Sequence, residues 1–448
     1  MNFHARPLQR TLILILLFTS AYANAQQAPE AAITSTQAVQ TLSAHLLSAI
    51  EKIPIFDDHS HPGFADDADV DAMASPPGSI PLRLRPDNPE LIVASKDLFG
   101  YPYNDATPDH LQWLVRRKAE LRKQKVGTAY FDDILNRLNV EEVLANRVRP
   151  AAYLSPKRFR WVFFVDSLLF PFDNHPAIAS NGNQAVFIPL QEKKLHDELA
   201  QQGLHQLPPT FDEYLAFITH LVENNQRHGG VAIKFEIAYF RSLHFDDPPK
   251  ASAASVYAKF RLSGAPSEAE YKDFQDYVFR YLVREAGRLH LPVDLHTAVG
   301  VGDFYSLHGG TALDLENVLR DPRYEATTFI LLHGGYPFQD QAIWLAARKN
   351  VYLDSSLMDL YLYPADFKTV LRHWLLLFPD KISFGSDAYP FSEAVGAEES
   401  YWIAVRTARV ALASALAEMV INHEVPEAGA LALARGYLHD NAAALYPH

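Results

Sequence analysis

The sequence contains no cysteine in its 448 residues, and it has 40 basic against 53 acidic side chains. The absence of cysteine excludes disulfide bonds, thiolate metal sites and a cysteine nucleophile, so histidine, carboxylate and lysine side chains must carry any site chemistry. The formal net charge of −13 argues against a broad phosphate-binding surface. We therefore expect a small-molecule substrate and no nucleic acid partner.

Long apolar runs are also scarce. The run from Thr11 to Ala25 follows Arg6 and Arg10 and ends in small residues, which is typical of a secretory signal peptide. An uncleaved anchor is the alternative, but the run is shorter than the roughly 20 residues that a bilayer span requires. The sequence predicts a signal peptide over residues 1–25 and a mature protein without a stable membrane anchor, exported across the inner membrane to the periplasm.

The rest of the composition, 48% hydrophobic and 21% charged, is that of a folded globular chain with a large core. Short apolar runs alternate along it with segments of helical periodicity, which predicts a parallel sheet with helical crossovers. The predicted strands are residues 53–56, Gly230–Phe235, Leu291–Leu295, Thr328–Leu332 and Lys381–Phe384. The predicted helices are Thr34–Lys52, Ser267–Leu289, Phe338–Lys349, Asp366–Phe378 and Glu398–His423.

An open doubly wound sheet and a closed (β/α)8 TIM barrel both fit this alternation. Candidate polar residues follow at least five of the strands, and only closure of the sheet brings all of them together. The sequence therefore predicts an α/β fold with a single (β/α)8 barrel domain over residues 26–448. Two insertions, near 66–125 and 239–266, are expected to cap the C-terminal mouth. A homo-oligomer is compatible with the sequence.

The pair His59 and His61 follows the first strand, and side chains two residues apart in extended chain leave the same face and can converge on one ion. With 19 histidines in the chain, about one such pair is expected by chance. The pair becomes stronger evidence for a metal site because His296, His333 and Asp387 also stand at strand ends, where a barrel places its active site.

Lys234 lies inside the apolar strand GVAIKF, where an unpaired ammonium group would be costly. Several nitrogen ligands with a carboxylate and a position open for water form a catalytic zinc site. Such an ion lowers the pKa of its bound water to about 7, and Asp387 would take the proton and pass it to a leaving group. We expect one or two divalent transition-metal ions, zinc before others.

In this order the residues resemble the amidohydrolase superfamily, in which H-x-H follows strand 1, Lys strand 4, His strands 5 and 6, and Asp strand 8. The chain is more similar to the amidohydrolase-like domain of FluG-type proteins, through the phrases LPVDLHTAVGVGDF, LLHGGYPF, NVYLDSS, ISFGSDAYP and DNAAALYP. FluG-type chains often continue into a glutamine-synthetase-like domain, which this sequence lacks, so the resemblance implies no ligase function.

The resemblance implies the metal ligands His59, His61, Lys234, His296, His333 and Asp387. In binuclear members the strand-4 lysine is carboxylated and bridges two ions. In mononuclear members the H-x-H pair, the strand-5 histidine and the strand-8 aspartate hold one ion, and the strand-6 histidine polarises the substrate. The sequence leaves both arrangements open and, through Lys234, slightly favours two ions.

Two further residues are candidates for substrate contact. Arg241 could hold a carboxylate through its planar fork, although a surface loop arginine is an equal alternative. Asp303 could orient a substrate ammonium group, although aspartate in a glycine-rich loop usually serves turn formation. Asp57 and Asp58 are expected to cap, or to hydrogen-bond histidine nitrogens that face away from the metal. Three other histidines are interpreted as structural: His308, His373 and His439.

The sequence thus predicts a metal-dependent hydrolase in which an activated hydroxide attacks an amide-type C–N or ester bond, with His333 polarising the carbonyl and Asp387 moving the proton. One alternative is a mononuclear relative that decarboxylates aromatic acids or isomerises sugar acids. Another is a periplasmic binding protein that keeps the barrel as a receptor. The sequence does not name the substrate.

Overall fold

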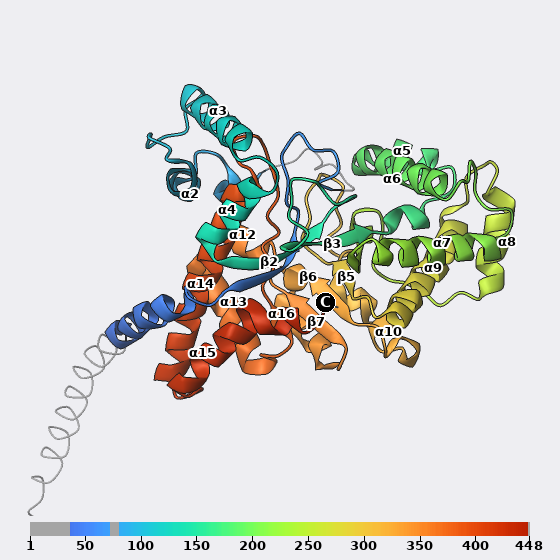
Figure 1. Ribbon diagram of the computed structural model, residues 1–448. Coiled ribbons are helices and arrows are strands. Elements are labelled where there is room, and N and C mark those ends of the chain that lie inside the picture. The colour runs from blue at the N-terminus through green and yellow to red at the C-terminus, as the bar shows by residue number, and fades with distance from the viewer. Residues whose placement is uncertain (1–35, 72–79, 447–448) are drawn as a thin grey trace, which may run out of the picture.

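The computed structural model describes residues 36–71 and 80–446. Eight strands form one sheet in which each strand pairs in parallel with the next along the chain. Figure 1 shows these strands at the centre of the molecule with helices around them. The strands are β1 (Ile55–Ser60), β2 (Val140–Asn146), β3 (Phe159–Phe164), β4 (Gly230–Phe235), β5 (Val293–His296), β6 (Phe329–Leu332), β7 (Val351–Asp354) and β8 (Ile382–Ser383).

Backbone hydrogen bonds between β1 and the segment that follows β8 close the sheet. Asp58 N donates to Phe384 O at 3.1 Å, and His61 N donates to Ala388 O at 2.9 Å. Asp387 N donates to His59 O at 2.8 Å. The predicted (β/α)8 barrel is therefore confirmed over the open sheet, and these contacts form what we call the β1/β8 seam.

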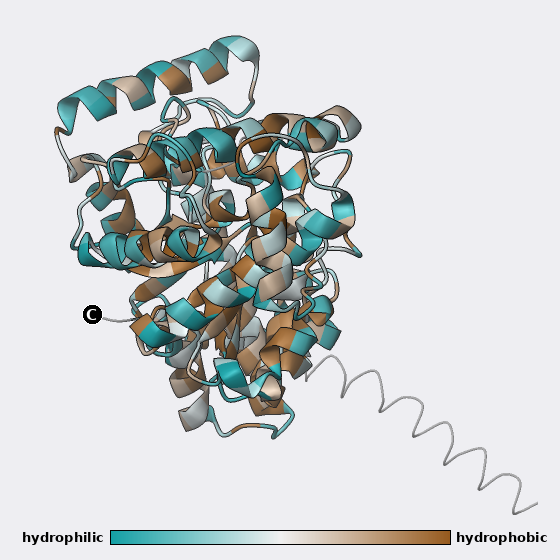
Figure 2. Ribbon diagram, turned by 90° about the vertical axis from the view of Figure 1, so that its right-hand side faces the viewer, coloured by the Kyte–Doolittle hydropathy of each residue, from teal (hydrophilic) through white to brown (hydrophobic). Residues whose placement is uncertain are grey.

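Helices cover the outside of the barrel, and Figure 2 shows hydrophilic residues on many of their outward faces. Residues 36–50 are helical, within the predicted helix. The helices that follow are α2 (Pro89–Phe99), α3 (Pro108–Gln124), α4 (Ala129–Leu138), α5 (His175–Ser180), α6 (Gly182–Gln201), α7 (Phe211–Arg227), α8 (Lys250–Phe260), α9 (Glu268–Leu289), α10 (Glu316–Leu319), α11 (Gln339–Ala342), α12 (Met358–Tyr361), α13 (Pro364–Leu377), α14 (Ala397–Ile421), α15 (Glu427–Arg435) and α16 (Asn441–Ala443).

Local sequence explains the long helix α9. Ser267 and Glu270 form a capping box, in which each side chain accepts a hydrogen bond from the other residue's backbone N–H. Phe274, Val278 and Leu282 recur at helical spacing and are fully buried. The helix is therefore fixed at its start by capping and along its length by burial.

The structure adds detail to the predicted elements. Strand β1 extends through His59 to Ser60, because its polar residues pair with β2 and with the seam. The insertion at 66–125 carries α2 and α3. In the insertion at 239–266, Tyr239 lies at the mouth, and α8 packs against α7 and α9 through its buried face of Ala253, Val256 and Tyr257.

The N-terminal end of the barrel is filled by a group of buried side chains that we call the barrel floor. It includes Phe56, Leu144 and Val162 from three strands and Tyr446 from the end of the chain. The rings of Tyr446 and Phe56 are stacked with centroids 6.3 Å apart. Tyr446 also donates from its hydroxyl to Asp294 Oδ1 at 3.2 Å, so the last described residue closes the barrel interior from below.

The predicted signal peptide over residues 1–25 lies outside the described residues. In the part of the chain that the structure describes, no helix is both long and apolar enough to cross a bilayer.

Candidate metal centre

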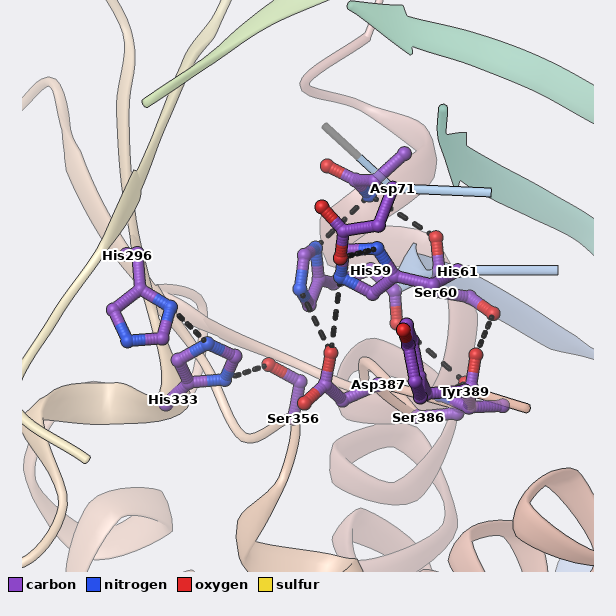
Figure 3. A network of polar contacts seen from close by, with 12 residues as sticks. His59, Ser60, His61, Asp71, His296, His333, Ser356, Ser386, Asp387 and Tyr389 are labelled. Carbon is purple, nitrogen blue, oxygen red and sulfur yellow. Dashed lines mark hydrogen bonds and ion pairs between the residues drawn. The ribbon is translucent and has the colours of Figure 1, made fainter. Parts of the chain in front are cut away.

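Three predicted ligands converge at the β1/β8 seam, as Figure 3 shows. His59 Nε2 lies 3.1 Å from Asp387 Oδ1, and His61 Nε2 lies 3.3 Å from the same oxygen. Both imidazoles are buried, and the Asp387 side chain is 14% exposed. The seam hydrogen bonds fix the two strand ends that carry these groups, so the convergence follows directly from closure of the barrel.

Two further predicted ligands lie next to this group. His333 Nε2 is 3.0 Å from His296 Nδ1, and the rings of His59 and His333 have centroids 5.3 Å apart. The ring nitrogens that face away from this group also have polar contacts. His296 Nε2 lies 2.7 Å from Val299 O, and His333 Nδ1 lies 2.8 Å from Ser356 Oγ. The nitrogens that face the site are therefore aimed by contacts on the far side of each ring.

Lys234 points from β4 into the same space. It is fully buried, and its Nζ lies 3.5 Å from His59 Nε2. Among the described residues it forms no ion pair with a carboxylate, although its charge acts to lower the pKa of the nearby Asp166 and Asp294. The structure thus brings all six predicted side chains to one end of the barrel interior.

The electrostatics of the site differ between its members. Burial, and then the charge of Lys234, hold the pKa of His59 well below its usual range and lower that of His296 to about 3. Burial opposes protonation of His61 as well, but Asp71 and Asp387 outweigh it and raise its pKa to about 10. Burial would raise the pKa of Asp387, yet hydrogen bonds from His59 and His61 hold it well below the ordinary value.

The backbone is strained at two of the predicted residues. His333 has φ of 61° and Asp387 has φ of 48°, in the left-handed region that residues other than glycine rarely adopt. Each is tied down, because His333 N donates to Asp354 Oδ1 at 2.6 Å and Asp387 N donates to His59 O. Such strain persists where the surroundings determine the conformation, and it is common at functional sites.

The two aspartates after the first strand differ from expectation. Asp57 accepts hydrogen bonds from Ser386 N at 2.8 Å and Ser386 Oγ at 2.6 Å, so it braces the seam instead of a histidine ring. Both carboxylate oxygens of Asp58 are buried without a hydrogen-bond partner among the described residues. Asp58 therefore serves neither as a cap nor as a histidine partner here. Burial and the neighbouring Asp354 raise its pKa.

The substrate roles predicted for Arg241 and Asp303 do not fit the structure. The Arg241 guanidinium lies 2.7 Å from Asp276 Oδ1, and it donates to Gln275 Oε1 on α9 and to the backbone oxygens of Ser242 and His244. Asp303 is exposed in a turn, and neither residue lines the cavity over the site. The histidines interpreted as structural lie outside the cavity lining. His308 and His373 are exposed, and His439 contacts Asp440.

A small cavity of about 90 Å³ opens above the histidines. Two acidic residues that the sequence reasoning missed, Asp71 and Glu236, line it together with His61. Burial and the Asp71 carboxylate raise the pKa of Glu236. Glu236 stands two residues after Lys234, so strand periodicity could have indicated it, whereas nothing in the sequence pattern marks Asp71.

The donor set fits a divalent transition metal. Two imidazole nitrogens and one carboxylate oxygen, each within 4.8 Å of the others, surround a common point. Borderline-soft ions such as zinc prefer imidazole and carboxylate ligands in this combination. Lys234, His296 and His333 lie beside it as further nitrogen donors.

A comparison with family models matches residues 213–448, more than half of the chain, to the model described as amidohydrolase. Protein fluG of Emericella nidulans is 29% identical over 157 residues, which are 35% of this chain and 17% of that protein. The match thus spans about a sixth of the length of that relative.

Solved structures share the fold. A metal-dependent hydrolase of Lactobacillus casei is 18% identical, with a TM-score of 0.57 over 89% of this chain and 96% of its own. A uronate isomerase of Thermotoga maritima is 12% identical, with a TM-score of 0.58 over 91% of this chain and 97% of its own. At these identities the likeness describes the architecture and leaves the reaction open.

Proposed function

The chain belongs to the amidohydrolase family, and on that premise we propose that it is a metal-dependent hydrolase acting on amide-type C–N or ester bonds of a small substrate. The observation that carries this proposal is the meeting of His59 Nε2, His61 Nε2 and Asp387 Oδ1 at one point at the base of the cavity. A binding protein needs no such group of ligands.

His59, His61 and Asp387 would hold the first ion, with Lys234, His296 and His333 completing the site or holding a second one. When bound, such an ion acidifies water and polarises a carbonyl oxygen. We propose zinc, because imidazole and carboxylate donors without thiolates suit a catalytic zinc site.

The protein's own groups have separate tasks in this proposal. Asp387 lines the cavity and can carry a proton from the attacking water to the leaving nitrogen or oxygen. His333, held at Nδ1 by Ser356, faces the cavity and can contact the substrate carbonyl. The aromatic side chains around the cavity exclude bulk water, which strengthens each polar contact inside.

Metal analysis of the purified protein tests the proposal. We expect about one or two transition-metal ions per chain, and loss of metal and of hydrolysis in His59→Ala. His373→Ala is the matched control, since His373 is exposed on α13, far from the cavity lining. Full activity in metal-free wild-type protein would defeat the proposal.

A non-hydrolytic reaction is the second candidate, because the fold is shared with the uronate isomerase of Thermotoga maritima. Mass spectrometry of the intact protein distinguishes the two. Carboxylation of Lys234 with two ions favours hydrolysis, and one ion with an unmodified Lys234 favours the lyase or isomerase chemistry. If Asp387→Asn binds ligand as well as the wild type and loses no activity, the protein is a receptor.

We also propose that residues 1–25 are a cleaved signal peptide and that the mature protein is periplasmic. The support is the pattern of arginines, apolar run and small residues at the N-terminus. N-terminal sequencing of protein from a native periplasmic extract should begin at Gln26. A start at Met1 would contradict it.

A further inference from the structure

The cavity is lined by phenylalanine and tyrosine rings, by the histidines of the metal site and by acidic side chains. Five rings line it, and Asp71, Glu236 and Asp387 supply the carboxylates. The rings belong to Phe187, Tyr239, Tyr361, Tyr389 and Phe391. No lysine or arginine lines the cavity in the described part of the chain, and the sequence of residues 72–79, which adjoins Asp71, contains none.

Glu236 is the acidic group that the metal site leaves unexplained. It is 4% exposed, and its Oε2 has no hydrogen-bond partner among the described residues. Its position is fixed, because its backbone N–H donates to both carboxylate oxygens of Asp166 at 3.0 Å. A buried carboxylate that is held in place without a partner is costly unless a cation or donor reaches it.

Asp71 stands on the other side of the same space. Its Oδ2 lies 3.1 Å from His61 Nδ1, and ligand atoms of Asp71, Glu236 and His61 lie within 4.8 Å of one another. Acceptors at such spacing can share one ammonium group, which has three N–H donors to satisfy. Aromatic faces nearby also attract a cation or pack on its apolar body.

We propose that Asp71 and Glu236 form a subsite for the ammonium group of a primary-amine substrate, whose apolar part packs on the aromatic wall. This inference rests on the proposed function and names its substrate class. It also separates this chain from enzymes that hold a substrate carboxylate with lysine or arginine, since neither residue type lines the cavity in the described part of the chain.

Calorimetric titration of the metal-loaded protein tests the subsite with three probes of one shape. Benzylamine is protonated at neutral pH, benzyl alcohol is neutral and benzoate is anionic. We expect benzylamine to bind at least about tenfold more tightly than benzyl alcohol, because charge-assisted hydrogen bonds are the stronger ones. Benzoate is the control for direct binding of a probe to the metal.

The variants Glu236→Gln and Asp71→Asn should each weaken benzylamine binding by about 10- to 100-fold while leaving benzyl alcohol unchanged. Glu268→Gln is the matched control, because Glu268 is an exposed carboxylate at the start of α9. Circular dichroism and metal content are measured on every variant. Equal binding of the three probes by the wild type, or unchanged benzylamine binding in both variants, overturns the inference.

Loss of one metal ion in Glu236→Gln would also overturn it, since Glu236 would then be a metal ligand. The outcome for hydrolysis is separate. If the protein shows this amine preference but hydrolyses no amide or ester, the subsite inference stands and the proposed function fails. If it hydrolyses amine and neutral substrates equally well, the proposed function stands and the subsite inference fails.

Discussion

Tyr446 closes the barrel floor, and truncating it should destabilise the protein by an amount that its surroundings set. The side chain is 3% exposed and packs on Phe56 and the other floor residues, so Tyr446→Ala removes a fully buried ring. Removal of a buried aromatic ring costs about 3–5 kcal/mol. Tyr446→Phe keeps the ring and removes only the hydrogen bond to Asp294, which is worth about 1 kcal/mol.

Urea unfolding followed by circular dichroism measures both values, from midpoints at constant slope. Leu376→Ala is the control, since Leu376 is 42% exposed on α13 and its truncation should change the free energy of unfolding by less than about 0.5 kcal/mol. If Tyr446→Ala costs no more than Tyr446→Phe, the ring does not pack as described, and the account of the barrel floor fails.

Three further changes probe the site and its supports. Burial raises the pKa of Asp166 to about 7 from an ordinary 3.8, so the folded state binds this proton more tightly and the wild type loses stability as the pH rises from about 4 to 7. Asp166→Asn should therefore gain stability relative to the wild type over that range in urea titrations, and a constant difference would contradict the shift. Gly334→Ala would place a methyl group 2.1 Å from a Trp374 ring carbon at a φ of 54°, and thermal unfolding should show a loss of about 1–3 kcal/mol; an unchanged melting temperature would refute the packing. Ser356→Ala removes the group that holds His333 Nδ1, so chelator competition should show metal affinity about 10- to 100-fold lower, whereas unchanged affinity would place His333 outside the metal site.

The sequence predicts the barrel and most of the site because the relevant signals are local. Strand β4 was placed at its observed bounds, since a strand buried on both faces reads as a continuous apolar run. Strand β2 was missed because Glu141 and Glu142 interrupt its apolar pattern. His296 and Asp387 were placed correctly because a parallel barrel collects whatever follows its strands at one end.

The missed parts of the site depend on contacts between distant segments. Asp71 lies in the loop after β1 and lines the cavity, and no periodicity in the sequence encodes that position. The sequence leaves Arg241 available to a substrate because its partner Asp276 lies 35 residues further along the chain, on a helix whose packing the sequence does not specify. Long-range pairing therefore decides which charges face the substrate.

The β1/β8 seam joins the first and last strands of the barrel at the same place where His59, His61 and Asp387 meet. An ion bound there would hold both sides of the joint together, so opening the barrel would require giving up the ion as well. Chelation should then speed amide hydrogen exchange at Asp58, His61 and Asp387 far more than at the buried middle of β4 or β5. The metal would therefore stabilise the closed barrel as well as supply the chemistry of the site.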